Sequence, residues 1–284
     1  MIRLALRVRR EDAEIALAEL LELAPSGVEE RELEGGAVVE YAVYGAPGEL
    51  PALPDLQAAV GGAIVEVVTE EIADDWHERW KAFHKPVDVP AGSRGGAGLR
   101  VRPPWEPALA PAAGEPVEDL VIDPGQAFGT GAHHTTRLCL ELLLELEPGG
   151  PCVDVGCGSG VLAIAAARLG WSPVLGFDHE AESVAATADN ARANGVEVEA
   201  RRFDLLFDGP APGAPTVLAN LLRPLLLRVA ETGFAEGLVP DVLIASGLLA
   251  HEADEVAAAF AASMGLCEVA RHHGGEWAAL LLRR

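Results

Sequence analysis

Apolar positions follow two different rhythms along the chain. Up to residue 72 they form short elements in which strand-like alternation and helical spacing succeed each other. From about residue 118, apolar strand-like runs alternate with longer helical stretches. Residues 73–117, between them, are rich in proline and glycine and show no sustained period. The pattern predicts two domains, 1–72 and 118–284, joined by a linker over 73–117.

The first domain is predicted to be a small α+β unit. Apolar and basic side chains alternate over 2–8, and Gly35-Gly36 is a hairpin turn signal between two strand-like runs. The expected elements are a strand, a helix, two strands, a helix and a strand, over 2–8, 11–24, 28–34, 37–44, 53–60 and 63–69. This β-α-β-β-α-β order is that of the ferredoxin-like split unit.

The second domain is predicted to contain a parallel sheet with helices on both faces. The expected strands are 151–156, 173–178, 196–202, 216–220 and 239–246, and the expected helices begin near 135, 161, 180, 222 and 251. Two further strand-like runs, 266–271 and 276–282, flank Gly274-Gly275 and predict an antiparallel hairpin. A parallel sheet closed by such a hairpin is the seven-stranded, Rossmann-like arrangement of many methyltransferases, so the fold class expected is α/β.

Composition narrows the classes of partner. The net charge is −23, and acidic residues outnumber basic ones both before and after residue 90. No Lys/Arg patch is present to bind nucleic acid directly, whereas a basic protein would be attracted; solubility alone accounts for most of the charge. No apolar run approaches the ~18 residues of a membrane span, and the start does not resemble a signal peptide.

The cysteines and histidines predict no metal site. Cys139, Cys152, Cys157 and Cys267 form no Cys-x-x-Cys pair or zinc spacing, and His133-His134 lacks a third ligand. We therefore expect a reduced, cytoplasmic protein. We also expect a monomer, because no exposed apolar helix or coiled-coil pattern stands out.

A glycine-rich turn between an expected strand and helix is the main candidate for ligand binding. Its glycines, Gly156, Gly158 and Gly160, let backbone N–H groups approach a ligand at a helix N-terminus. A dinucleotide site requires G-x-G-x-x-G, but Val161 stands at the third glycine position. Asp154 places an acid before the turn, which suits a cationic ligand better than a pyrophosphate.

Two acids follow the next strands. Asp178 ends the second strand, where a carboxylate accepts both ribose hydroxyls. Together with the turn and Asp154, it fits S-adenosylmethionine, although a purely structural turn stays an alternative. Asp204, after the third strand, could reach the adenine amino group or be a surface turn residue.

Two further segments could act on a ligand. Residues 123–136 are dense in small and hydroxyl side chains and could fold over a ligand, or form a loop capped by Thr135. Asn220 ends the fourth strand, at the edge where open α/β sheets bind ligands. Its amide could accept a hydrogen bond from a substrate amine, or it could be a helix N-cap.

These motifs resemble the ribosomal protein L11 methyltransferase family. The resemblance covers residues 74–284; residues 1–72 match only in element order. It rests on the segment Asp123–Thr136, the turn Asp154–Gly160, Ala219-Asn220-Leu221, Ser246-Gly247-Leu248-Leu249, Glu276-Trp277 and, in the linker, Asp75-Trp76, Trp80 and Lys85-Pro86.

The resemblance implies an S-adenosylmethionine-dependent enzyme that methylates lysine ε-amines and the N-terminal α-amine of ribosomal protein L11, gripped by the small N-terminal domain. Carried over by motif, the cofactor-site residues are Thr136, Gly156, Asp178 and Asn220, and the residues of a loop closing over the site are Phe128, Gly129 and Thr130. Asn220 is also the residue expected to orient the amine, and no dedicated general base is expected.

Other functions compete with this interpretation. A methyltransferase of another protein or of a small-molecule amine is the nearest, although Leu221-Leu222 after Asn220 departs from the Asn-Pro-Pro-Tyr of enzymes that act on nucleic-acid amines or glutamine. Val161 and the C-terminal hairpin oppose a nicotinamide oxidoreductase. A non-catalytic module that binds the cofactor during ribosome assembly is a further alternative, against which Asn220 and Thr136 argue.

Overall fold

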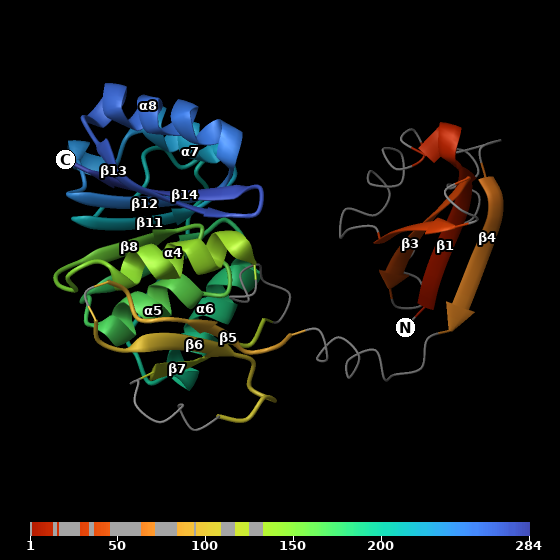
Figure 1. Cartoon of the computed structure of the whole chain (residues 1–284), viewed down its shortest axis with the longest axis horizontal. Helices are drawn as coiled ribbons and strands as arrows, with labels where there is room; N and C mark the ends of the chain where they lie inside the picture. The colour runs from red at the N-terminus through yellow and green to blue at the C-terminus, as the bar shows by residue number, and fades with distance from the viewer. Residues whose placement is uncertain are drawn as a thin grey trace. The chain divides into compact units, whose positions relative to one another are not determined.

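The chain forms two compact units, Met1–Phe83 and His84–Arg284, each of which is described by itself. The computed structural model describes residues 2–13, 16, 29–33, 37–45, 64–71, 84–93, 95–108, 117–124 and 133–284. Figure 1 shows the two units and the order of their elements. Among the described helices, none is long and apolar enough to cross a membrane.

The first unit contains a four-stranded antiparallel sheet of order β2-β3-β1-β4. Its strands are β1 (Ile2–Arg9), β2 (Glu29–Leu33), β3 (Val38–Gly45) and β4 (Ile64–Glu71), and a single 3₁₀ turn follows β1 (Arg10–Asp12). These strands confirm the four that the alternation predicts. Most of the helix expected over 11–24 lies outside the described residues. The helix expected over 53–60 lies entirely outside them. Glu40 is buried and pairs with both Arg3 and Arg7 of β1.

The second unit is built on a mixed sheet of order β10-β9-β8-β11-β12-β14-β13. Its strands are β8 (Cys152–Val155), β9 (Val174–Asp178), β10 (Glu199–Arg202), β11 (Thr216–Asn220), β12 (Val242–Leu249), β13 (Cys267–Gly274) and β14 (Trp277–Arg283). The first five in this order are parallel, and β14 and β13 form an antiparallel hairpin beside β12. The central strands read as continuous apolar runs because both faces of the sheet are covered.

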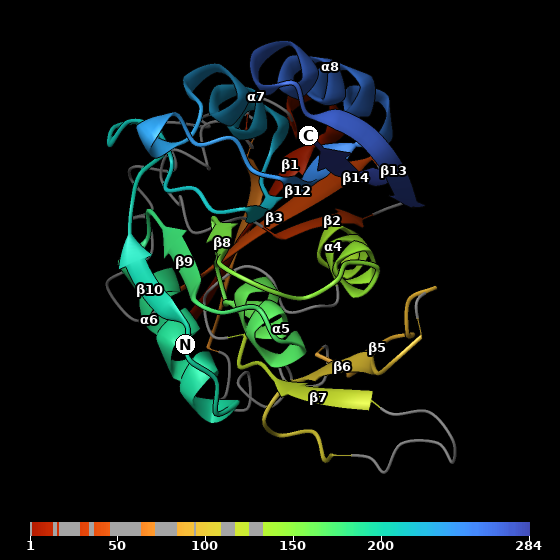
Figure 2. The same ribbon diagram turned by 90° about the vertical axis from the view of Figure 1, so that its left-hand side faces the viewer.

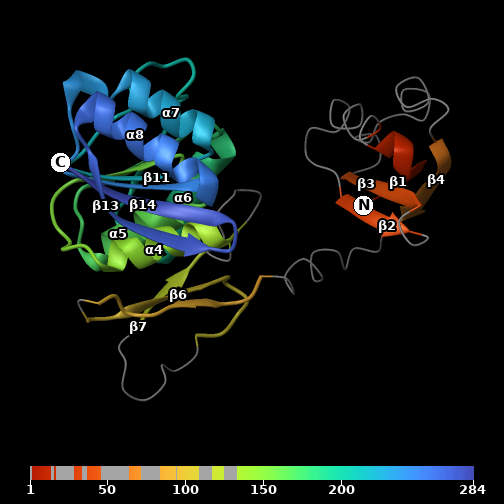
Figure 3. The same ribbon diagram turned by 45° about the horizontal axis from the view of Figure 1, so that its top comes forward.

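Five helices cover the two faces of this sheet. They are α4 (His134–Leu144), α5 (Val161–Leu169), α6 (Ala181–Ala193), α7 (Arg223–Thr232) and α8 (Ala253–Met264). Figures 2 and 3 show α4, α5 and α6 on one face and α7 and α8 on the other. Each layer has its own buried cluster, with Ile164 and Leu142 in the first and Val256 and Phe260 in the second. The expected α/β methyltransferase architecture is confirmed.

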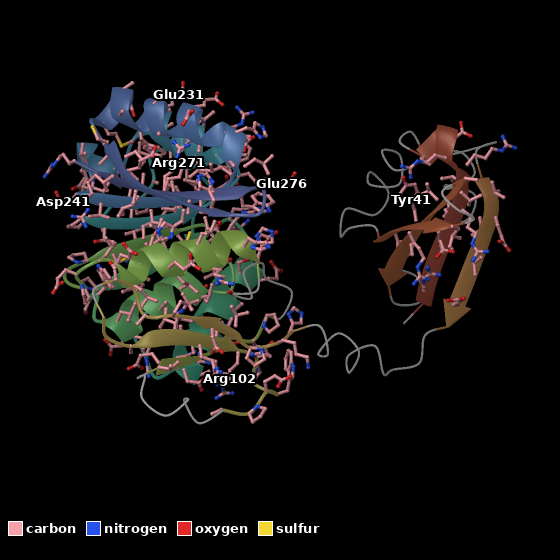
Figure 4. All side chains as sticks on the ribbon, viewed as in Figure 1. Tyr41, Arg102, Glu231, Asp241, Arg271 and Glu276 are labelled. Atoms are coloured by element: carbon pink, nitrogen blue, oxygen red, sulfur yellow. The ribbon has the colours of Figure 1, made fainter. Side chains whose placement is uncertain are left out.

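The expected linker is partly folded. Within 73–117, strand β5 (Val87–Val89) pairs with β6 (Gly98–Arg102), and β6 pairs with β7 (Val117–Val121), so that the three form a sheet in the second unit. Figure 4 shows Arg102 on this sheet, where its guanidinium binds the Asp119 carboxylate at 2.7 Å. Because β5 and β6 are short and interrupted by proline and glycine, they have little periodicity of their own. Burial of Leu99 and Leu120 in the α4–α5 layer stabilises them.

Candidate active site

A pocket of about 580 Å³ opens at the carboxyl ends of the parallel strands of the second unit. Its walls come from the segments that follow β8, β9, β10 and β11, from Gly247 within β12, from Trp277 at the start of β14 and from the start of α4. Of the residues proposed from the sequence, six line this pocket: Thr136, Gly156, Gly158, Asp178, Asp204 and Asn220. The structure therefore brings together side chains that are far apart in the chain, as the rule for open α/β sheets requires.

The glycine turn has a backbone that other residues rarely adopt. Gly156, Gly158 and Gly160 have φ values of 75°, 52° and 82°. A Cβ atom at Gly156 would lie 2.5 Å from Leu221 Cδ2, and one at Gly160 would lie 2.9 Å from Thr187 Cγ2 and Oγ1. Glycine is therefore required both for the conformation and for the close packing. Gly156 borders the pocket, so a side chain there would push Leu221, which also lines it.

Asp178 is held rigidly at the end of β9. Its Oδ2 accepts a hydrogen bond from the Gly158 N–H at 3.0 Å, and its Oδ1 accepts one from the Glu180 N–H at 3.1 Å. The His179 Nδ1 atom lies 3.2 Å from Oδ1. A carboxylate has about four lone-pair sites, so Asp178 keeps acceptor capacity toward the pocket. These bonds connect the acid directly to the glycine turn and fix its orientation.

Asn220 has a buried oxygen atom without a partner among the described residues. Its Nδ2 donates a hydrogen bond to Thr136 Oγ1 at 3.3 Å, whereas its Oδ1 has none. The N-cap of α7 is Leu222, so Asn220 is the last residue of β11 and not a helix cap. Leaving a buried acceptor unsatisfied costs about 1–3 kcal/mol. A hydrogen-bond donor from a ligand would remove this cost.

Asp154 lies behind the glycine turn and is not among the residues that line the pocket. Its Oδ2 accepts a hydrogen bond from the Ala163 N–H at 3.1 Å, and its Oδ1 has no partner among the described residues. Burial raises the pKa of Asp154 to about 7; the Ala163 hydrogen bond opposes this shift and the charge of Asp178 adds to it. The sequence pattern placed Asp154 beside the cofactor, whereas the structure buries it beneath the turn and away from the pocket lining.

Asp204 both lines the pocket and takes part in a turn. It lines the pocket, and its Oδ1 also accepts a hydrogen bond from the Leu206 N–H at 2.8 Å, as in an Asx turn. Arg228 of α7 donates to the backbone carbonyls of Leu205 and Leu206 at 2.7 and 2.9 Å. The loop after β10 is thus held in place at the β9–β10 end of the pocket.

The opposite end of the pocket has an aromatic wall. His133 is the N-cap of α4 and accepts a hydrogen bond from the Thr135 N–H, so the cap is His133 and not Thr135. Its ring meets Trp277 of β14 edge to face, with centroids 5.1 Å apart, and both residues line the pocket. From the sequence, Trp277 is recognised only as part of a motif, because its neighbouring residues do not indicate which part of the fold its side chain contacts. Phe128, Gly129 and Thr130 lie outside the described residues.

The thiol in the turn is not set up for nucleophilic chemistry. Cys157 lines the pocket, and burial raises the pKa of its thiol to about 12. A nucleophilic cysteine needs the opposite shift. No group of three or more His, Cys, Asp or Glu side chains with metal-binding geometry occurs in the described ranges.

The fold and the site together define a class of protein. A glycine turn after the first strand, an acid fixed to it at the end of the next strand, and a terminal antiparallel hairpin are the features of an S-adenosylmethionine-dependent methyltransferase. The unpaired, buried oxygen of Asn220 fits a hydrogen-bond donor in such a reaction.

Comparisons with known proteins support this class and identify the family. The sequence model described as "Ribosomal protein L11 methyltransferase (PrmA)" matches residues 49–284, and the chain belongs to this family. A ribosomal protein L11 methyltransferase of Geobacter sulfurreducens is 41% identical over 234 residues, which are 81% of this chain and 74% of the relative. A ribosomal protein L11 methyltransferase of Heliobacterium modesticaldum is 39% identical over 223 residues, which are 76% of this chain and 66% of the relative.

A solved structure resembles the larger part of the chain. The ribosomal protein L11 methylase of Lactobacillus delbrueckii subsp. bulgaricus superposes with a TM-score of 0.56 at 29% identity. The match covers 66% of this chain and 94% of that one. The expected family is therefore confirmed.

Proposed function

We propose that this protein transfers methyl groups from S-adenosylmethionine to amines of ribosomal protein L11, namely lysine ε-amines and the N-terminal α-amine. The relatives are named for methylating that protein. The observation that carries the proposal is the buried, unpaired Oδ1 of Asn220 in the pocket, fixed by the bond from its Nδ2 to Thr136.

The residues divide the pocket between cofactor and acceptor. The cofactor supplies a methyl group on a cationic sulfonium. Asp178 would hold the ribose, Asp204 and its loop the adenine, and Gly156 and Gly158 the amino-acid end. The sheet order places β9 and β10 on one side of β8, and β11, β12 and β14 on the other. Asn220 and Trp277 therefore lie on the side left for the acceptor.

The amine must lose its proton before it attacks. With a reference pKa of about 10.4, deprotonating a lysine at pH 7 costs about 4.6 kcal/mol. Burial in a pocket with apolar walls lowers the amine pKa and offsets part of this cost. Asn220 would then accept a hydrogen bond from the neutral amine and orient its lone pair. No dedicated base is needed for this arrangement.

The first unit is proposed to recognise the protein substrate. Its strand order, β2-β3-β1-β4, supports a ferredoxin-like domain over residues 1–72. The net charge of −23 favours a basic substrate over nucleic acid. We propose that the protein acts as a monomer in the cytoplasm, on L11 that is not yet bound to ribosomal RNA.

Mass spectrometry of the substrate tests this function. Unmodified L11 is mixed with the full chain and S-adenosylmethionine, and its intact mass is recorded over time. We expect successive additions of methyl groups, whose end point counts the sites. Binding of the cofactor without any mass change would overturn the proposal in favour of another acceptor or a non-catalytic module.

A further inference from the structure

Two asparagines of α6 and its C-terminal end bind the segment that follows β7. Asn194 accepts a hydrogen bond from the Val121 N–H at 2.8 Å and donates to the Val121 carbonyl at 2.6 Å. Asn190, one helical turn earlier, binds Asp123 in the same way. Its Oδ1 accepts a hydrogen bond from the Asp123 N–H at 2.9 Å, and its Nδ2 donates one to the Asp123 carbonyl at 3.1 Å. Each side-chain amide thus satisfies both backbone groups of one residue, as a neighbouring strand would.

The two asparagines differ in their third contact. Nδ2 of Asn190 also donates to the carbonyl of Ser159 in the glycine turn, at 2.9 Å. Nδ2 of Asn194 instead donates to the Asn190 carbonyl at 2.8 Å, within the helix. Both side chains are nearly buried, at 4% and 9% exposure. The pair therefore provides one residue that reaches the turn and a neighbour that does not.

The same helix holds a second carbonyl of the turn. Thr187 Oγ1 donates to the Gly158 carbonyl at 3.0 Å, one turn of α6 before Asn190. Because each peptide unit is planar, fixing the carbonyls of Gly158 and Ser159 also fixes the following N–H groups. Thr187 and Asn190 thus determine the orientation of two consecutive peptide units of the turn, and Gly158 both lines the pocket and binds Asp178.

Asp123 is the first residue of the segment 123–136, which the sequence marks as able to fold over a ligand. At the other end of that segment, Thr136 binds Asn220. The start of the segment is therefore connected to the glycine turn through Asn190, and its end to the acceptor side through Thr136. One buried amide links Asp123 and Ser159, which are 36 positions apart in sequence.

We infer that Asn190 is a positioning residue for the cofactor: it connects Asp123 to the glycine turn and fixes the turn for binding. This inference rests on the S-adenosylmethionine assignment of the proposed function. It does not depend on which amine is methylated. Asn190 touches neither cofactor nor acceptor in this arrangement, and it acts through Ser159 and Asp123.

Paired variants separate positioning from general stability. Asn190→Ala and Asn194→Ala each remove an amide that binds an extended backbone segment, but only the first releases the Ser159 carbonyl. We expect both to lower the melting temperature of the full chain to a similar extent. We expect Asn190→Ala to weaken binding of S-adenosylhomocysteine, measured by calorimetry, about tenfold, and Asn194→Ala less than about twofold.

A conservative variant covers the case in which Asn190→Ala does not fold. Asn190→Asp keeps the shape and the acceptor for the Asp123 N–H but loses the donor to the carbonyls of Ser159 and Asp123. It should weaken S-adenosylhomocysteine binding by at least as much as the alanine variant. Wild-type affinity in a folded Asn190 variant, or an equal loss in Asn194→Ala, would overturn the inference. A wild-type chain that binds S-adenosylhomocysteine but does not methylate L11 would overturn the proposed function alone.

Discussion

Asn220 Nδ2 donates a hydrogen bond to Thr136 Oγ1 at 3.3 Å, although the two residues are 84 positions apart. The bond fixes the amide so that its nitrogen faces Thr136 and its oxygen stays without a partner among the described residues. A residue that only held the fold together would use both ends of its amide. The arrangement instead leaves one buried acceptor without a partner on a residue that lines the pocket.

Replacement of Asn220 by alanine should reduce turnover more than cofactor binding. Losing the group that orients the amine is expected to lower kcat about 100-fold, while the affinity for S-adenosylhomocysteine changes by less than about threefold. Steady-state kinetics with L11 and calorimetry with S-adenosylhomocysteine measure the two effects. Thr136→Val, which keeps the amide but removes its anchor, should show a smaller loss of kcat. Equal losses of turnover and affinity in Asn220→Ala would mean that Asn220 only holds the cofactor.

Gly247 should be intolerant of any side chain. It lies at a bulge of β12 with a φ of 85°, and a Cβ atom there would be 2.4 Å from the Leu221 carbonyl oxygen. Because backbone atoms must move, Gly247→Ala is expected to cost more than about 3 kcal/mol of unfolding free energy. Gly265→Ala is the matched control: its φ is 70° but nothing lies within 4 Å of the added Cβ. It should cost about 1–2 kcal/mol, and equal costs in urea unfolding would contradict the packing argument.

Asp154 should make stability fall as pH rises. Its pKa in the folded protein is about 7, above the roughly 3.9 of an unfolded chain. Between these values the unfolded state releases the proton that the folded state retains, so stability declines by about 1.4 kcal/mol per pH unit and levels off above pH 7. An asparagine at this position does not titrate, so the stability of the Asp154→Asn variant relative to wild type should rise between about pH 4 and pH 7. Parallel pH profiles in urea unfolding would show that Asp154 is ionised throughout.

Thiol reagents should react with one cysteine of the native protein. Cys267 is exposed, whereas Cys139, Cys152 and Cys157 are buried, and burial raises the pKa of each buried thiol. At about pH 7.5 iodoacetamide should therefore label a single site, identified by peptide mass spectrometry, and Cys267→Ser should abolish rapid labelling. Methyl transfer should be unaffected by labelling at Cys267. Rapid modification of Cys157 in the folded protein would instead identify a reactive thiol in the pocket.

Residues whose conformation or position depends on their immediate neighbours could be predicted from the sequence. Glycines with a required positive φ, and an acid directly after an apolar strand, mark Gly156 and Asp178 without knowledge of the fold. Asn220 could be located at a strand end, but the choice between ligand contact and helix cap needed the structure, which places the cap at Leu222. Strands β5 and β6 within the expected linker could not be predicted from the sequence, because they depend on pairing and on burial against helices.

Asn190 and Asn194 were missed, although a signal exists. Two asparagines four residues apart on one face of a helix are unfavourable for the helix itself, because their side chains compete for backbone hydrogen bonds. Such a pair indicates partners outside the helix. The sequence does not identify these partners, since Val121, Asp123 and Ser159 lie 31 to 73 positions away.

The sequence by itself determined the order of strands and helices from α4 to β14, the glycine turn and the acid that follows it, because period and backbone freedom are properties of neighbouring residues. Only the tertiary structure decided that Asp154 is buried behind the turn, that Asn220 keeps an unpaired oxygen, and that Asn190 joins Asp123 to Ser159. Each of these depends on contacts across the sheet and its helices, and the geometry of such contacts is set by packing between segments far apart in the chain.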